Sequence, residues 1–474
     1  MQNNKLIQVL RALKKEEVRA FGKYIQALYG NYEVALGLFD YLKANHPALQ
    51  GPKLDKDTVA RKLLPPSAEN PAKRILNESS RLYKWLEEFL LLEKLREKDN
   101  PAREILMAEI FRERQLSHLF YLKVAGFVSA CEQKAPADIR DIADALYMQH
   151  LWYYYSDPDE GLHTRGQATL RGLMETADSL FLAAKLQYGA ELLNRGNLLK
   201  EDNLPRLWRE AKKEIEQAPH GHGLLQQAFY LAAQLLEEKG LPQYQQLKAF
   251  FSDNHHLFSL EVQQILQGYL INHAARRIKQ SEYNWIEEAL SLYEFGMSTQ
   301  ILFENGLISS IRFINIVNLA CHQGKLDWAE AFVEKWSPYL RPGLRPNTQA
   351  VAEALILFER GRFGAVRQKV SQCHNQDPLL EARLRALMVM AMVEEKEEEG
   401  FILDYCRNYR DYLRRNKVMG ENTAEGFSNF VSALMKYIRN SVGPEKLAEE
   451  VHAYPYIFCK TWLLHKIGKG EVAR

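Results

Sequence analysis

The chain reads Phe313-Ile314-Asn315-Ile316-Val317-Asn318-Leu319-Ala320, then Gly324-Lys325-Leu326-Asp327-Trp328-Ala329, and a related pattern follows 37 residues later. The second copy has apolar positions from Ala350 to Phe358, and then Gly361-Arg362-Phe363-Gly364-Ala365-Val366. In each copy a glycine separates two apolar stripes, where it permits a tight turn between two helices. Because one helix pair cannot bury its apolar face alone, the pattern predicts helix pairs that stack on their neighbours.

These two units resemble the tetratricopeptide repeat, a helix-turn-helix unit. They depart from that family in their period, which is 37 rather than about 34 residues. The tryptophan and the leucine-glycine pair of the family's first helix are absent, and Val366 stands where alanine is usual. The whole chain also resembles helical-repeat proteins of unknown function from Bacteroidota. The tetratricopeptide resemblance implies an α-solenoid whose long concave surface binds a peptide or a helix of another protein.

Composition favours helix along the rest of the chain. Of its 474 residues, 46% are apolar and 26% are charged. Leucine, alanine, glutamate, lysine, glutamine and arginine dominate, and these side chains, which are not branched at Cβ, lose little rotamer freedom in a helix. No segment shows strands at regular spacing. The sequence therefore predicts an all-α fold of antiparallel helix pairs, stacked as a tetratricopeptide-like superhelix that follows an N-terminal helical module.

The N-terminal module occupies the first hundred residues. Apolar residues from Leu6 to Leu28 keep helical spacing, and Gly30 is expected to end this stripe as a left-handed cap. A long helix is predicted from about Ala72 to Lys98. The segment Asp99-Asn100-Pro101 is typical of a cap followed by a first-turn proline. We therefore predict an N-terminal helical module at 1–99 and a helical-repeat superhelix at 100–474.

Cysteine usage and hydropathy indicate the compartment. The five cysteines are scattered and include no C-x-x-C pair, which favours reduced thiols in a reducing compartment. The first residues lack the apolar core of a signal peptide. The longest apolar run, Ala386 to Val393, is far below the roughly 20 residues that cross a bilayer. The sequence predicts a cytoplasmic protein without a membrane partner.

Asn315 and Asn318 are the first candidate binding residues. Some tetratricopeptide proteins hold a partner's terminal carboxylate with lysine, asparagine and arginine on their inner helices, and these asparagines lie on a helix that can be inner. The matching helix of the next unit offers Thr348, Val351 and Ala352, with no basic residue. The alternative is that both asparagines are hydrogen-bonded groove residues without a ligand.

A basic stripe is the second candidate. Arg407, Arg410, Arg414 and Lys417 recur at helical spacing, and Tyr405 and Tyr412 flank them. Basic groups beside aromatic rings can hold phosphates and stack bases, so the stripe could bind nucleic acid. The alternative is the solvated face of an amphipathic helix. A formal net charge of only +2 counts against a general electrostatic attraction to nucleic acid.

Metal and catalytic signals are weak. The pairs Cys321-His322 and Cys373-His374 contain zinc ligands, but zinc needs three or four ligands that converge, and no third pair accompanies these two. Phosphate-binding loops, dinucleotide-binding glycine patterns and nucleophile elbows are missing from the sequence. We expect no cofactor, no metal and no catalytic residue.

Three functions remain open at this point. The leading hypothesis is a non-catalytic scaffold that binds another protein or a peptide. The alternative is a nucleic-acid-binding helical repeat, which requires the Arg407 stripe to line a continuous groove. The third is an enzyme with an unrecognised site, for which the N-terminal module is the first place to look. The sequence leaves the partner and the oligomeric state undefined.

Overall fold

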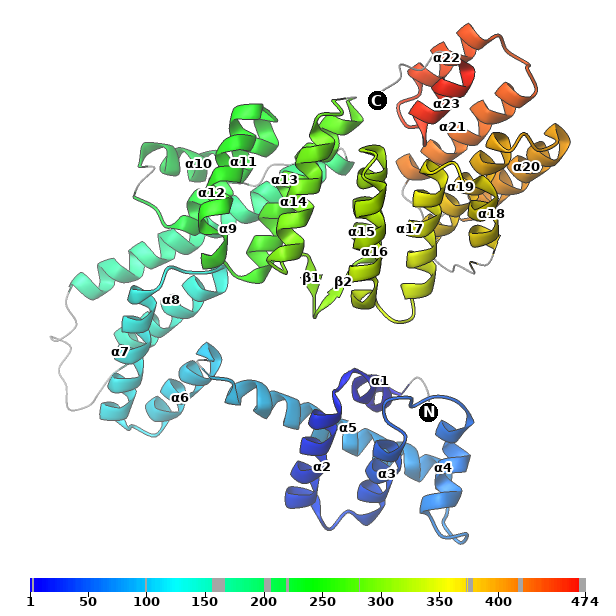
Figure 1. The fold of residues 1–474 in the computed structure, drawn as a ribbon. Coiled ribbons are helices and arrows are strands. Elements are labelled where there is room, and N and C mark those ends of the chain that lie inside the picture. The colour runs from blue at the N-terminus through cyan, green and yellow to red at the C-terminus, as the bar shows by residue number, and fades with distance from the viewer. Residues whose placement is uncertain are drawn as a thin grey trace. The chain divides into compact units, whose positions relative to one another are not determined.

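The computed structural model describes residues 1, 4–98, 100–155, 167–199, 206–218, 221–280, 282–371, 373, 378–416 and 421–468. Within these residues the chain forms 23 α-helices and one two-stranded hairpin, which confirms the predicted all-α class (Figure 1). The chain divides into two compact units, residues 1–135 with 140–180 and residues 136–139 with 181–474. The boundary predicted between residues 99 and 100 falls within the first unit and stays a prediction.

The first five helices share one apolar core. Their bounds are α1 Lys5–Ala12, α2 Lys15–Tyr29, α3 Glu33–Ala44, α4 Lys56–Leu63 and α5 Pro71–Arg96. The predicted long helix corresponds to α5, which packs against α1, α2, α3 and α4. Phe21 lies at the centre of this core and contacts the rings of Phe39 and Phe89. The regular spacing of apolar residues thus leads to a helical bundle here.

Two details near the N-terminus differ from the sequence prediction. The stripe from Leu6 to Leu28 is split, because Leu13 is extended and α2 begins anew at Lys15, where Glu17 accepts a hydrogen bond from the Lys14 N–H at 2.6 Å. Gly30 is right-handed, with φ −54°, so its predicted left-handed conformation is wrong. The chain reverses here through a hydrogen bond from the Tyr32 N–H to the Tyr29 carbonyl instead.

The rest of the first unit has a smaller core. It contains α6 Pro101–Glu113, α7 Ser117–Gln133, most of α8 Ile139–Tyr154 and the start of α9 Gln167–Leu199. Phe120 and Val124 of α7 pack with Met148 and Leu151 of α8. This small cluster is separate from the core of α1 to α5.

The second unit contains the remainder of α9 and fourteen further helices. Its first helices are α10 Trp208–Gln217, α11 Leu224–Glu238, α12 Leu241–Asn254, α13 Leu260–Lys279 and α14 Trp285–Ser298. A hairpin follows, in which β1 Phe303–Glu304 pairs antiparallel with β2 Leu307–Ile308. The helices that follow the hairpin are α15 Ser310–His322, α16 Leu326–Trp336, α17 Arg345–Glu359, α18 Phe363–Ser371, α19 Pro378–Glu394, α20 Glu399–Arg415, α21 Glu421–Ile438, α22 Pro444–Ala453 and α23 Lys460–Ile467.

Successive helices of the second unit pack as pairs, from α11 with α12 to α19 with α20. Contacts also join the pairs, because α15 packs on α17 and α17 on α19 (Figure 1). Gly324 and Gly361, at φ +67° and +69°, lie in the turns that follow α15 and α17. These two glycines have the left-handed conformation that tight turns favour.

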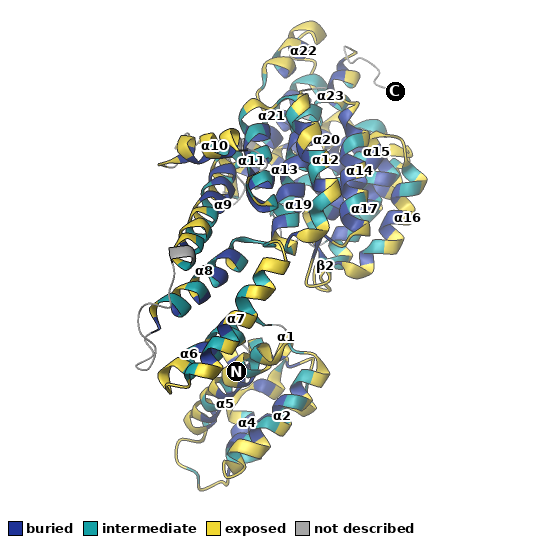
Figure 2. Cartoon of the chain, turned by 90° about the vertical axis from the view of Figure 1, so that its left-hand side faces the viewer, coloured by how far each residue is buried: buried dark blue, intermediate teal, exposed yellow. Residues whose placement is uncertain are grey.

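Burial follows the helical period. Figure 2 shows buried and exposed positions within single turns of the same helix, as amphipathic helices require. Ala329 and Val366, which occupy the same place in the two repeat copies, are both fully buried. No helix in the described parts of the chain is long and apolar enough to span a membrane.

Candidate functional site

The two predicted asparagines lie on α15 and are half-buried. Asn315 accepts a long hydrogen bond from Arg383 of α19, with 3.5 Å between its Oδ1 and the arginine Nη1. Tyr293, on the neighbouring helix α14, is buried. Burial raises the pKa of the Tyr293 phenol. The structure therefore brings a basic group to Asn315, although the sequence comparison with the next repeat found none.

That basic group comes from an unexpected helix. The matching positions of α17, Thr348, Val351 and Ala352, are all buried in the packing of the helices. The Thr348 hydroxyl lies 2.9 Å from both the Leu344 carbonyl and the Ser310 hydroxyl of α15, so it is already engaged within the protein. Arg383 lies one helix pair further along, on α19. Asn315 is thus linked to α19 by a polar contact with Arg383.

The two cysteine-histidine pairs form no metal site among the residues that the structure describes. Burial raises the pKa of the Cys321 thiol to about 12, which favours its neutral form, whereas the neighbouring His322 is exposed. His374 lies outside the described residues. Among the residues that the structure does describe, no three metal-ligating side chains converge.

The predicted basic stripe lies on α20. Arg407, Arg410 and Arg414 are exposed there, whereas Lys417 lies outside the described residues. Arg407 forms an ion pair with Asp404 and Arg414 forms one with Asp411, each with an acid one turn earlier on the same helix. The stripe is therefore partly neutralised by its own helix.

The tyrosines beside this stripe are engaged in packing. Tyr412 donates a hydrogen bond to the Pro378 carbonyl at 3.1 Å, and the guanidinium of Arg385 lies 4.6 Å from the centre of its ring. Tyr405 is half-buried, and burial raises the pKa of its phenol to about 12. These interactions hold both rings against the protein.

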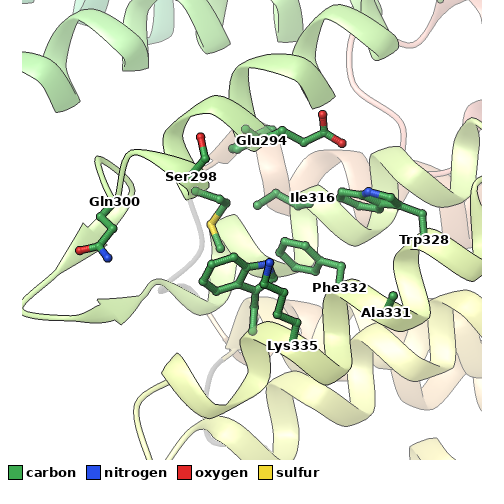
Figure 3. A pocket seen from close by; sticks show the side chains of 11 residues that line it. Glu294, Ser298, Gln300, Ile316, Trp328, Ala331, Phe332 and Lys335 are labelled. Atoms are coloured by element: carbon green, nitrogen blue, oxygen red, sulfur yellow. The ribbon is translucent and has the colours of Figure 1, made fainter. Parts of the chain in front are cut away.

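The structure also contains a pocket that the sequence did not predict. We call it the α14–α16 pocket, a cavity of about 500 Å³ between the second helices of two successive pairs (Figure 3). Helix α14 lines it with Tyr293, Glu294, Met297 and Ser298, and α16 lines it with Trp328, Ala331, Phe332, Lys335 and Trp336. Ile316 of α15 and Gln300 complete the lining.

Helical spacing explains how the pocket is built. On α16 the three large rings recur every four residues, so Trp328, Phe332 and Trp336 lie on one face of the helix. The rings of Trp328 and Phe332 are stacked, with centres 5.3 Å apart. Trp336 is held by the ring of Tyr339, at 5.4 Å between centres. Ala331 lies among these large side chains, and its small size leaves space between the two helices.

The pocket combines an apolar floor with a polar rim. Met297, Ile316 and Phe332 are buried, whereas Glu294 and Lys335 are exposed. A cavity of this size with mostly apolar walls and a few polar groups is the usual form of a ligand-binding site in proteins. Trp328, which belongs to the first repeat copy, thus also lines an open recess.

Comparisons of the chain with protein-family models, with curated proteins and with solved structures found no match.

Proposed function

We propose that the chain is a non-catalytic scaffold that binds another protein or a peptide in the cytoplasm. The observation that carries this proposal is the α14–α16 pocket, which keeps aromatic and aliphatic surface open to solvent. Trp328 and Trp336 are only half-buried, although tryptophan contributes more apolar area to a core than other residues. Exposed apolar surface with a polar rim is typical of sites where another protein docks.

We also propose that α15–α16 and α17–α18 are successive units of a tetratricopeptide-like superhelix. Three features support this: the matching left-handed glycines in the two turns, the equivalent buried positions Ala329 and Val366, and the packing of α15 on α17. Such stacking leaves long surfaces along both helix layers. In this proposal Asn315, Asn318 and the α14–α16 pocket are available to a partner.

Binding of nucleic acid is supported less well. Of the described arginines in the basic stripe, Arg407 and Arg414 already pair with aspartates of α20. Each phosphate contact made by such an arginine would first have to break an ion pair, which reduces the electrostatic gain. We therefore favour a protein partner over a nucleic acid.

An affinity capture tests the proposed function. The tagged full chain is incubated with lysate of its native host, with and without nuclease, and bound proteins are quantified by mass spectrometry. We expect protein partners that nuclease does not remove. The matched control replaces Arg407 and Arg414 by glutamine, which should leave these partners bound. Partners that disappear on nuclease treatment and in the double variant would support nucleic-acid binding instead.

A further inference from the structure

The walls of the α14–α16 pocket define what can occupy its centre. Met297, Ile316 and Phe332 form a buried apolar floor, and Trp336 lies beside them. A polar group placed on this floor would lose water without gaining a hydrogen-bond partner, which is costly. A large aliphatic or aromatic side chain, by contrast, gains from each apolar contact there. The centre of the pocket therefore favours a large apolar group.

The rim carries two opposite charges, and they differ in their surroundings. The amine of Lys335 lies 4.8 Å from the centre of the Trp336 ring, so this cation is already in contact with an aromatic face. Glu294 is exposed, and no described residue forms an ion pair or a hydrogen bond with it. Figure 3 shows Glu294 reaching from α14 toward Trp328 on α16. An unpaired carboxylate beside an indole ring thus bounds one end of the pocket.

This end of the pocket suits a basic side chain. A lysine or arginine can lay its aliphatic stem or guanidinium plane on the Trp328 ring while its charge pairs with Glu294. The pair is charge-assisted and lies partly sheltered by the indole, so it is stronger than a fully exposed ion pair. An acidic side chain in the same place would be repelled by Glu294.

The occupant enters from the surface. Five of the lining residues are exposed, from both helices and from the segment after α14: Glu294, Ser298, Gln300, Ala331 and Lys335. An opening bounded on both sides by exposed residues admits a polypeptide whose main chain stays outside while one or two side chains enter. This arrangement is typical of peptide recognition by anchoring side chains in pockets.

We propose that the α14–α16 pocket binds a segment of another protein in which a large apolar residue lies next to a lysine or arginine. The inference rests on the proposed scaffold function and specifies the chemistry of its partner. The apolar side chain occupies the floor over Ile316, and the basic side chain lies on Trp328 and pairs with Glu294.

Selection from a displayed library of random 12-residue peptides tests this proposal. The library is selected in parallel on the full wild-type chain and on Glu294→Lys. We expect wild-type selection to enrich peptides with a large apolar residue near a lysine or arginine. Selection on Glu294→Lys should lose the basic residue, because the charge at that end of the pocket is reversed.

The most enriched wild-type peptide is then synthesised with a fluorescent label, and its affinity is measured by anisotropy. Glu294→Gln should weaken binding about tenfold, through loss of the charge-assisted pair. Ala331→Phe should weaken binding by at least about tenfold, because the added ring occupies the space that Ala331 leaves. Glu334→Gln, the same change on α16 outside the pocket lining, should leave affinity within about twofold. Unchanged circular dichroism shows that Ala331→Phe is folded.

Two results would overturn the inference in different ways. Enriched peptides that lack a basic residue, or that bind Ala331→Phe as well as wild type, would refute the proposed occupant of this pocket, and the affinity capture would then decide the scaffold function separately. Selection that enriches no peptide on the full chain would count against both the pocket and the proposed function.

Discussion

Replacing Gly296 by alanine is the sharpest test of how the helices beneath the pocket pack. Gly296 lies on α14, and a Cβ atom added there would stand 2.2 Å from Nε2 of Gln267 and 2.7 Å from Cγ of Leu302. Gln267 is fully buried on α13, and its Nε2 donates to the Leu292 carbonyl at 2.8 Å. The added methyl group therefore requires a fully buried side chain to move by more than an ångström.

The expected cost follows from three contributions. Overpacking of a dense core costs about 1–3 kcal/mol. If Gln267 loses its hydrogen bond to the Leu292 carbonyl, a buried amide is left unpaired, at about 1–3 kcal/mol. Alanine is better than glycine in a helix by about 1 kcal/mol, which offsets part of this loss. We expect Gly296→Ala to lower the free energy of unfolding by about 3 kcal/mol.

Gly268→Ala provides the matched control. Gly268 lies on α13 beside Gln267, and no atom lies within 4 Å of the Cβ that alanine would add. This variant should be unchanged or more stable by up to about 1 kcal/mol. Urea unfolding followed by far-ultraviolet circular dichroism, fitted separately for each transition, measures both variants. If Gly296→Ala were as stable as Gly268→Ala, the described contact between α13 and α14 would be incorrect.

Three further predictions concern single groups of the second unit. Burial, followed by the nearby charge of Arg277, lowers the pKa of His273 to about 4, below its usual 6.5. Protonation of His273 therefore favours the unfolded chain. The contribution of the neutral ring to the free energy of unfolding is fully present above pH 6.5 and is lost as the pH falls toward 4. Between pH 7 and pH 5 the free energy of unfolding should fall by about 2 kcal/mol less in His273→Gln than in the wild type, as measured by urea unfolding at both pH values. An equal fall in the two proteins would contradict this prediction. Gly324→Ala should lower the free energy of unfolding by about 1 kcal/mol, because the left-handed backbone disfavours alanine, and Gly324→Asn should lower it less. Equal thermal midpoints for the wild type and both variants would refute this. The thiol of Cys321 is buried, and its pKa is raised to about 12. It should react with iodoacetamide at pH 8 far more slowly in the native chain than in urea, as measured by peptide mass spectrometry. Equal labelling in both conditions would show that the thiol is accessible.

Regular periodicity allowed much of the fold to be predicted from the sequence. The helix expected from about Ala72 to Lys98 is α5, Pro71–Arg96, because apolar spacing and flanking prolines define a helix locally. Gly324 was expected to permit a tight turn, and it adopts the left-handed conformation. Gly30 departs from the expected left-handed conformation, since a glycine at a helix end permits a left-handed cap without requiring one. The break at Leu13 does not show in the sequence pattern, because apolar spacing continues across it.

The candidate site was harder to predict because it depends on distances between helices. The arginine at Asn315 comes from α19, whereas comparison of adjacent repeats directed attention to α17. The α14–α16 pocket exists because α14 and α16 stay apart above Ile316, and no local pattern encodes that separation. The ion pairs of the basic stripe do have a sequence signal, because an aspartate precedes Arg407 and Arg414 by three residues, a spacing at which ion pairs form on a helix.

Hydrogen–deuterium exchange of the full chain with a captured protein partner tests the central claim most directly. The amide exchange of every peptide is compared with and without that partner. We predict slower exchange in α14, Trp285–Ser298, and in α16, Leu326–Trp336, when the partner is bound. Exchange that slows only elsewhere in the chain, with α14 and α16 unchanged, would contradict the claim that this pocket is where the scaffold holds its partner.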